Sequence, residues 1–187
     1  MVVGDSLSAG FGLKQNEVWV DLLDKHLAEN NLPYAVINAS ISGETTLGGQ
    51  QRLPSLISNH TPNIVIIELG GNDGLRGLSP KVIRQNLDAM ITLCQSKNID
   101  VLLVGIRLPP NYGPVYTKRF EQIFYDLAQS KNVPLVPSIL AGLEDGLNLF
   151  QADGIHPTAN AQPILFKNVW EKLSPMIKNS APRDRIF

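Results

Sequence analysis

Residues 64–74 read IVIIELGGNDG, and the fold prediction starts from this stretch. Its first half is an unbroken apolar run rich in Ile and Val, which is typical of a strand buried on both faces. Its second half is a glycine-rich turn that carries polar side chains. We therefore predict a buried strand over Ile64–Leu69 that leads into a polar loop at its carboxyl end.

The same alternation of short apolar runs and longer amphipathic stretches extends outward in both directions. The predicted strands are Val2–Gly4, Tyr34–Asn38, Ile64–Leu69, Val101–Ile106 and Leu135–Val136. The predicted helices carry apolar residues at helical spacing and are Val18–Ala28, Pro80–Lys97, Val115–Ser130 and a final helix with Pro163 in its first turn that includes Ile177. This alternation predicts an α/β protein, a three-layer α/β/α sandwich around a mostly parallel sheet of five strands. In such sheets, ligands bind beyond the carboxyl ends of the strands.

Composition limits the class of function. The chain has 187 residues, and we predict one domain over residues 1–187. Its 17 acidic residues nearly balance its 16 basic ones, which argues against a nucleic-acid partner. The longest apolar runs, such as Val101–Val104, fall far short of the roughly 18 residues that a membrane span needs. Residues 1–4 carry no basic or long apolar segment of a secretory signal, and removal of a signal is left open.

Two segments at opposite ends of the chain carry residues typical of nucleophilic catalysis. The first predicted strand runs into GDSLSAG, residues 4–10, which places Ser6 at a strand end. The last predicted strand is followed by DGIHP, residues 153–157, where Asp153 and His156 lie three positions apart. A serine hydroxyl becomes a nucleophile when a base removes its proton, and a carboxylate orients that base. Alone, each of these residues is read as an ordinary turn or loop residue, so the catalytic interpretation needs further evidence.

That evidence comes from two loops in the middle of the chain. The second predicted strand leads into NASISGE, residues 38–44, and the third leads into GGNDG, residues 70–74. A tetrahedral oxyanion needs preorganised donors, and each is typically worth about 3 to 4 kcal/mol of barrier. The backbone amides of Ser6 and Gly43 and the side-chain amide of Asn72 are the candidate donors, although Gly43 and Asn72 taken singly are typical turn residues.

Taken together, the four segments resemble the SGNH, or GDSL, hydrolase superfamily, whose name residues correspond to Ser6, Gly43, Asn72 and His156. Residues 38–43, 68–77 and 106–109 resemble the subgroup of bacterial multifunctional thioesterase I, lysophospholipase L1 and arylesterase. The resemblance covers nearly the whole chain. It implies a flavodoxin-like sheet, hydrolysis of acyl esters and thioesters through an acyl-serine, no cofactor and a monomer. It also implies export to the bacterial periplasm or secretion after removal of a signal, while a cytoplasmic location is left open. Only three residues precede Gly4, fewer than is usual in the family, so we expect a short first strand.

The resemblance also implies that the loops after the third and fourth strands shape the acyl site. The apolar residues of these loops that are predicted to bind substrate are Leu75, Leu78, Leu108, Pro109, Pro110 and Tyr112. Gly74 and Gly77 would allow the first loop to close over substrate. Glu68 and Arg107 both interrupt apolar strands, and because buried charges need partners we predict that these two residues pair.

Other readings of the chain compete with this one. No serine lies in G-x-S-x-G, and Gln15 replaces the third glycine of a G-x-G-x-x-G motif, which disfavours an α/β-hydrolase and a dinucleotide-binding protein. The three histidines and one cysteine are scattered, so no metal site is predicted. A carbohydrate acetylesterase of the same superfamily and a non-catalytic binding module remain as alternatives. The predicted partner is a small acyl ester or thioester.

Overall fold

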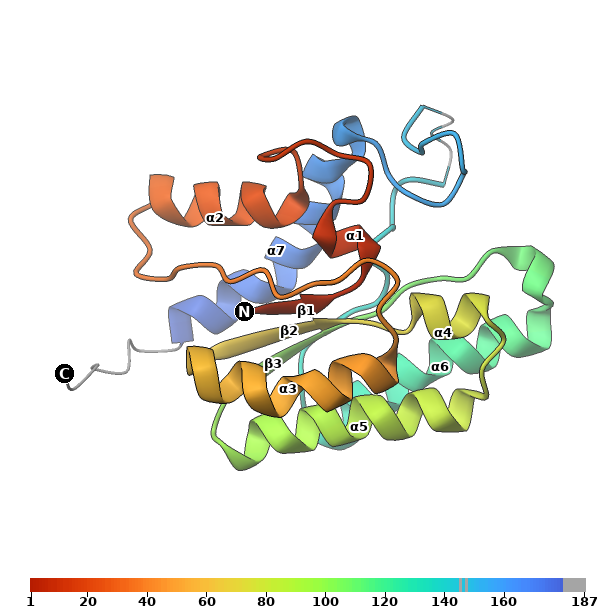
Figure 1. The fold of residues 1–187 in the computed structure, drawn as a ribbon, viewed down its shortest axis with the longest axis horizontal. Helices are drawn as coiled ribbons and strands as arrows, with labels where there is room; N and C mark the ends of the chain where they lie inside the picture. Colours follow the sequence, from red (N-terminus) through yellow and green to blue (C-terminus); the bar gives the residue numbers. More distant parts are fainter. Residues whose placement is uncertain (145, 147, 180–187) are drawn as a thin grey trace.

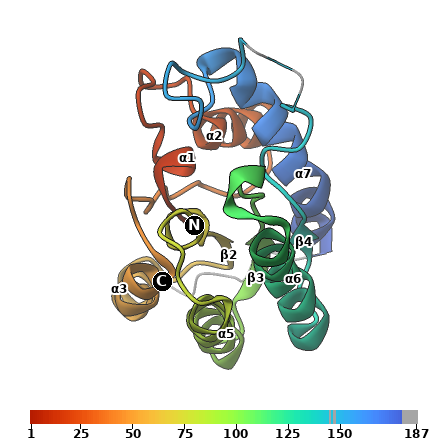
Figure 2. The ribbon, with the colours of Figure 1, turned by 90° about the vertical axis from the view of Figure 1, so that its right-hand side faces the viewer.

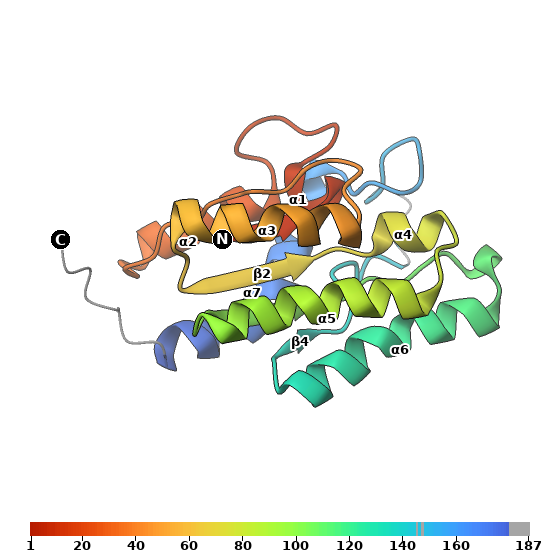
Figure 3. The ribbon, with the colours of Figure 1, turned by 60° about the horizontal axis from the view of Figure 1, so that its bottom comes forward.

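The sheet at the centre of the protein has four parallel strands. The structure is a computed structural model that describes residues 1–144, 146 and 148–179. Its strands are β1 (Val2–Gly4), β2 (Ile64–Glu68), β3 (Asp100–Val104) and β4 (Leu135–Val136), and they lie side by side in the order of the sequence. Every residue of β2 is buried, as its apolar composition predicts. In Figure 3, β2 points toward the edge where the short helix α4 (Gly71–Leu75) lies.

Helices cover both faces of this sheet (Figure 1). One layer contains α2 (Trp19–Glu29) and α7 (Gln162–Asn179), and the other contains α3 (Thr46–His60), α5 (Pro80–Ser96) and α6 (Pro114–Lys131). Alternate residues of the strands enter different cores, because side chains of a strand point to opposite faces. Ile64 and Ile66 pack with α2 and α7, whereas Val65 and Ile67 pack with the other three helices. The three-layer α/β/α prediction is confirmed.

The strand count was predicted wrongly, because Tyr34–Asn38 is not a strand. This segment runs beside β1 but forms only one parallel bridge, between Val2 and Asn38. Two residues earlier, the backbone N–H of Val36 donates to Asp24 Oδ1 at 3.2 Å. The Ile37 carbonyl accepts from the Val2 amide at 2.8 Å and the Ala39 amide donates to the Val2 carbonyl at 2.9 Å, but the pairing does not extend to a second bridge, so the sheet has four strands and not five.

Helix α3 was not predicted, and its composition explains why. It contains Gly48, Gly49 and Pro54, all of which have low helix propensity. The helix begins after Thr45, whose hydroxyl accepts a hydrogen bond from the Gly48 amide at 3.2 Å. A Cβ atom at Gly49 would lie 2.3 Å from the Leu69 side chain, so this glycine lets the helix approach the sheet closely. Tertiary packing therefore overrides weak local propensity. The four predicted helices are present: α2, α5 and α6 begin and end within one residue of their expected bounds, and α7 has Pro163 in its first turn and includes Ile177, as expected.

Candidate active site

Ser6 is the first residue of α1 (Ser6–Ala9), a single helical turn directly after β1. Asp5 caps this turn, since its Oδ1 accepts a hydrogen bond from the Leu7 amide at 3.0 Å. Gly10 ends the turn in the left-handed conformation, with φ at 78°. At the start of a helix the first amides have no acceptor within the helix. The Ser6 hydroxyl and its own amide are therefore presented together at the carboxyl edge of the sheet.

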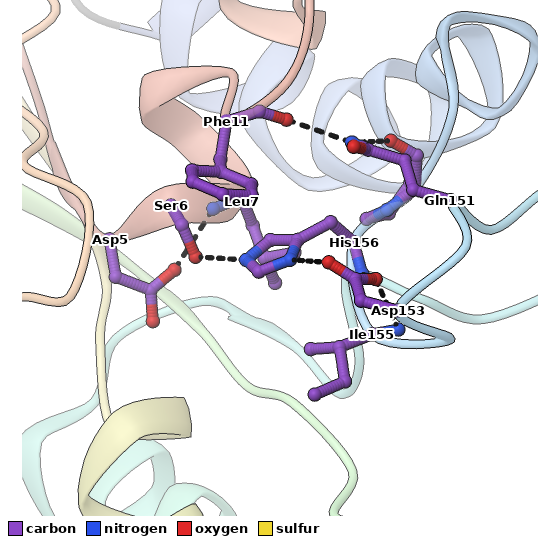
Figure 4. Close-up of polar contacts among 9 residues, drawn as sticks. Asp5, Ser6, Leu7, Phe11, Gln151, Asp153, Ile155 and His156 are labelled. Carbon is purple, nitrogen blue, oxygen red and sulfur yellow. Dashed lines mark hydrogen bonds and ion pairs between the residues drawn. The ribbon is translucent and has the colours of Figure 1, made fainter.

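A chain of short hydrogen bonds joins Ser6 to residues 150 positions away (Figure 4). His156 Nε2 lies 2.8 Å from Ser6 Oγ, and His156 Nδ1 lies 2.7 Å from Asp153 Oδ2. A carboxylate only accepts hydrogen bonds, so the neutral imidazole carries its proton on Nδ1 and leaves Nε2 to accept from the serine hydroxyl. The structure brings the three candidate catalytic residues together in the order that proton transfer requires.

The loop around Asp153 is folded so that this carboxylate stays ionised. Its Oδ1 accepts hydrogen bonds from the backbone amides of His156 at 3.0 Å and Ile155 at 2.9 Å. These bonds, the one from the His156 amide first, and the bond to the His156 ring lower the pKa of Asp153 from its ordinary 3.8 to about 2. Two atoms of one carboxylate thus hold both the backbone and the ring of His156.

Two residues that the sequence did not single out also hold His156. The ring of Phe11 lies 4.5 Å from the imidazole, measured between ring centroids. Gln151 bonds to both partners of this contact: its backbone amide donates to the His156 carbonyl at 2.7 Å, and its side-chain Nε2 donates to the Phe11 carbonyl at 2.8 Å. Gln151 therefore fastens the histidine loop to the segment that follows α1 (Figure 4). No local pattern marks Gln151, because its partners are far away in the sequence.

Asn72 connects the two other candidate oxyanion segments. Its Nδ2 donates to Asp5 Oδ2 at 3.1 Å and to the Glu44 carbonyl at 2.9 Å. Asn72 thus lies between the residue before Ser6 and the residue after Gly43. The Gly43 backbone has a φ of 80°, and its amide has no hydrogen-bond acceptor within the described part of the chain. Both donor positions of Asn72 are engaged here, so its use as an oxyanion donor requires one bond to open or to be shared.

Beneath the Ser6 turn lie two buried acids, Asp5 and Glu68, and neither has an ion-pair partner among the described residues. Glu68 Oε2 accepts a hydrogen bond from the Ser8 hydroxyl at 2.7 Å and a long one from the Asp5 amide at 3.4 Å. Burial first, and the charge of Asp5 second, raise the pKa of Glu68 well above its ordinary range. Burial likewise raises the pKa of Asp5 from 3.8 to about 6, against the hydrogen bond from the Leu7 amide. Both shifts favour the neutral forms of the two carboxyl groups.

The predicted pair of Glu68 and Arg107 is wrong. Arg107 follows the end of β3 and extends into solvent, where its guanidinium lies 3.7 Å from Glu144 and both side chains are more than half exposed. Glu68 instead bonds to Ser8 on the helical turn that follows the adjacent strand. A protonated carboxyl needs hydrogen-bond partners but no counter-charge, which is why the argument from buried charge failed.

Comparison with known proteins agrees with this geometry. The model of the GDSL-like lipase/acylhydrolase family matches residues 2–162. The chain belongs to this family. It is 48% identical to Esterase TesA of Pseudomonas aeruginosa, over 95% of this chain and 88% of that one. It is 39% identical to Thioesterase 1/protease 1/lysophospholipase L1 of Escherichia coli K12, over 97% of this chain and 86% of that one. The crystal structure of TesA superimposes with a TM-score of 0.91, covering 94% of this chain and 97% of that one. The crystal structure of the psychrotrophic esterase EstA from Pseudoalteromonas, which is 38% identical in sequence, superimposes with a TM-score of 0.90. The match covers 95% of this chain and 97% of that one.

A cleft of about 700 Å³ opens beside Ser6 and His156 in this family member. Four of the six residues predicted to bind substrate line it, namely Leu75, Leu108, Pro109 and Pro110. The structure places the other two elsewhere. Leu78 packs against the core, and Tyr112 donates its hydroxyl proton to the Leu75 carbonyl at 3.0 Å. Among the described residues, no group of His, Cys, Asp or Glu side chains is arranged to hold a metal ion.

The opposite wall of the cleft comes from the segment between β4 and His156, which was not considered for substrate binding. Its apolar lining residues are Leu140, Leu143, Phe150 and Ile155, and Ile106 continues this surface after β3. These residues lie in an irregular connection, where hydrophobic spacing gives no signal. Only the return of the chain to the carboxyl edge places them opposite Leu75 and Leu108.

Proposed function

We propose that this family member hydrolyses acyl esters and thioesters in two steps through an acyl-enzyme on Ser6. The observation that carries the proposal is the hydrogen-bonded series from Ser6 through His156 to Asp153, with heavy-atom distances of 2.8 and 2.7 Å. These distances lie within the range needed for a positioned general base. The related esterase, arylesterase and thioesterase/lysophospholipase support the same reaction class.

In the first step, Ser6 Oγ attacks the acyl carbonyl carbon while His156 Nε2 takes the hydroxyl proton. The bond from Oγ to carbon forms, and the carbonyl electrons move to oxygen. The backbone amides of Ser6 and Gly43 then donate to this oxyanion, and Asn72 joins them by sharing one of its two bonds. His156 returns the proton to the leaving oxygen or sulfur as the bond to the acyl carbon breaks.

In the second step, water takes the place of the alcohol or thiol. His156 removes a proton from the water, the resulting hydroxide attacks the acyl carbon, and the proton is returned to Ser6 Oγ as the acid leaves. Asp153 stays ionised throughout, since its pKa is held at about 2, and it stabilises the imidazolium in both steps. No step in this sequence requires a cofactor.

The cleft supports an acyl chain as the part of the substrate that is recognised. Leu75, Leu108, Pro109 and Pro110 on one side face an apolar wall from the loop before His156. Each methylene group buried there is worth about 0.8 kcal/mol, so a longer chain gains affinity until the cleft is filled. Arg107, Ser138 and Glu144 also line the cleft, but apolar side chains make up most of its walls, which favours an acyl chain over an acetylated carbohydrate.

Covalent labelling tests the nucleophile. A fluorophosphonate probe is expected to label the wild type and the surface variant Ser96→Ala equally, and to leave Ser6→Ala unlabelled. Labelling of Ser6→Ala at the wild-type rate contradicts the assignment. Comparing an acetylated sugar with acyl esters and acyl thioesters of increasing length then separates the proposed function from that of a carbohydrate acetylesterase. Binding of these compounds without turnover would indicate a binding module instead.

We further propose that the protein acts as a monomer outside the cytoplasm, as the family resemblance implies. Within the described residues, no helix is both long and apolar enough to cross a membrane. Fractionation of a producing bacterium and light scattering of the purified protein test the two statements separately.

A further inference from the structure

The exposed apolar side chains of the described residues gather at one edge of the molecule. Seven large ones are at least 43% exposed: Phe11, Ile41, Leu47, Val82, Val115, Tyr125 and Ile155. Phe11 follows α1, Ile41 lies in the connection before α3, and Ile155 lies between β4 and α7, whereas Leu47, Val82 and Val115 lie in the first turns of α3, α5 and α6. These segments meet at the carboxyl edge of the sheet, which Figure 2 shows with α5 and α6 seen end-on. The cleft beside Ser6 opens at the same edge.

Part of this edge is also strongly basic. Residues 74–87 and 106–120 contain no Asp or Glu, and their basic residues are Arg76, Lys81, Arg84, Arg107, Lys118 and Arg119. Of these six, Arg107 alone has an ion-pair partner in the part of the chain that the structure describes. The chain as a whole has a net charge of −1, so this concentration of cations is local.

We call the exposed basic and apolar residues at the start of α5 and α6, together with the loop before α5, the basic edge. Its residues are Arg76, Lys81, Val82, Val115, Lys118 and Arg119. Two hydrogen bonds join its halves: Tyr116 donates its hydroxyl proton to the Leu78 carbonyl at 2.7 Å, and Tyr112 donates to the Leu75 carbonyl at 3.0 Å. Shallow hollows of about 430 and 340 Å³ lie here, lined by Val115 and Arg119 among others.

The basic edge is continuous with the cleft. Leu75 lines the cleft and accepts the bond from Tyr112, which itself borders one of the hollows. Pro109 and Pro110 line the cleft immediately before this tyrosine. A flat partner that covers the basic edge would therefore also lie across the mouth of the cleft.

We propose that the basic edge docks the protein onto the surface of an anionic phospholipid layer. Unpaired cations attract the phosphate groups, and Val82 and Val115 enter the boundary between headgroups and acyl chains. The exposed residues of the basic edge are cationic or aliphatic, and the partly buried Tyr116 ring stacks on Phe120 with ring centroids 6.5 Å apart, so the basic edge itself presents no exposed aromatic ring of the kind on which nucleic-acid bases stack. In this orientation the cleft faces the lipid, which brings acyl chains to Ser6.

Vesicle binding tests this proposal, with the purified protein and its variants in a flotation assay. The test variant is Lys81→Gln/Lys118→Gln/Arg119→Gln. The control variant is Lys97→Gln/Lys167→Gln/Lys172→Gln, which removes the same charge from exposed positions outside the basic edge. Vesicles that mix phosphatidylglycerol with phosphatidylcholine are compared with vesicles of phosphatidylcholine alone. Each basic residue near an anionic surface contributes about fivefold to partitioning, so the test variant is expected to bind about 100-fold more weakly.

The wild type and the control variant are expected to bind the anionic vesicles alike and to release them as salt is raised. Failure of the wild type to prefer anionic vesicles, or equal binding by the test variant, overturns the proposal. Inorganic phosphate that displaces the protein more strongly than sodium chloride of the same ionic strength also overturns it, because the surface then binds an isolated phosphate group. Binding does not depend on the proposed function: Ser6→Ala is expected to keep it, and the test variant is expected to keep its hydrolysis of a soluble short-chain ester.

Discussion

Replacing Glu68 by Gln should change how the stability of the protein depends on pH. Glu68 and Asp5 are buried acids, and their folded-state pKa values lie above their ordinary ones. The folded protein therefore holds protons that the unfolded chain releases, and the free energy of unfolding falls as the pH rises. The contribution of the two protonated acids to the free energy of unfolding is complete below about pH 4. It is lost as the pH rises through their folded-state pKa values, which are about 6 for Asp5 and well above the ordinary value for Glu68.

The structure gives the size of this effect. The pKa of Asp5 rises from 3.8 to about 6, and each unit is worth about 1.4 kcal/mol, so Asp5 accounts for a loss of about 3 kcal/mol by neutral pH. Glu68 acts in the same direction. In Glu68→Gln the amide oxygen still accepts the bonds from the Ser8 hydroxyl and the Asp5 amide, while the ionisable group is removed. The variant should match the wild type near pH 4 and become the more stable of the two near pH 8.

Urea unfolding at a series of pH values between 4 and 8 measures the two curves, with the exposed Glu171→Gln as the matched control. Parallel curves for the wild type and Glu68→Gln refute the reasoning, because Glu68 would then be ionised in both states. Glu68→Ala separates charge from hydrogen bonding. Because the Ser8 hydroxyl loses its acceptor, this variant should be less stable than Glu68→Gln by about 1 to 3 kcal/mol at every pH.

Two further predictions concern catalysis. Asp153→Asn should lower kcat for a soluble ester about 10,000-fold without unfolding the protein, because an amide cannot orient the imidazole as a carboxylate does. Asp126→Asn on α6 serves as the control. A loss of kcat below about tenfold in Asp153→Asn would contradict the assigned role. Leu143→Ala, on the cleft wall that the sequence did not reveal, should shift the preference in kcat/KM toward longer acyl chains, since removing a buried side chain enlarges the cleft. An unchanged chain-length profile, measured against the partly buried control variant Val133→Ala just before β4, places the acyl chain elsewhere.

The position of the active site follows largely from the sequence. Apolar runs that alternate with amphipathic stretches require parallel strands with helices on both faces, and the carboxyl ends of such strands share one edge. Ser6, Gly43 and Asn72 each lie within about six residues of the end of an apolar run, and Asp153 and His156 are three positions apart, so a local loop suffices to join base and carboxylate. The family was recognisable because these residues keep their order in the chain.

Contacts between distant segments were not predictable in this way. The run at Tyr34–Asn38 has the composition of a strand, yet its pairing with β1 stops at a single bridge between Val2 and Asn38. The partner of Glu68 is Ser8 and not Arg107, because burial of a protonated acid calls for a hydroxyl group rather than a cation. Gln151 carries no motif and acquires its role only when Phe11 lies against His156. The layers of the fold and the reactive groups follow from periodicity and local spacing, which the amino-acid order contains. The extent of pairing at Tyr34–Asn38, the partner of Glu68 and the far wall of the cleft follow from tertiary packing, because each depends on which distant segments meet.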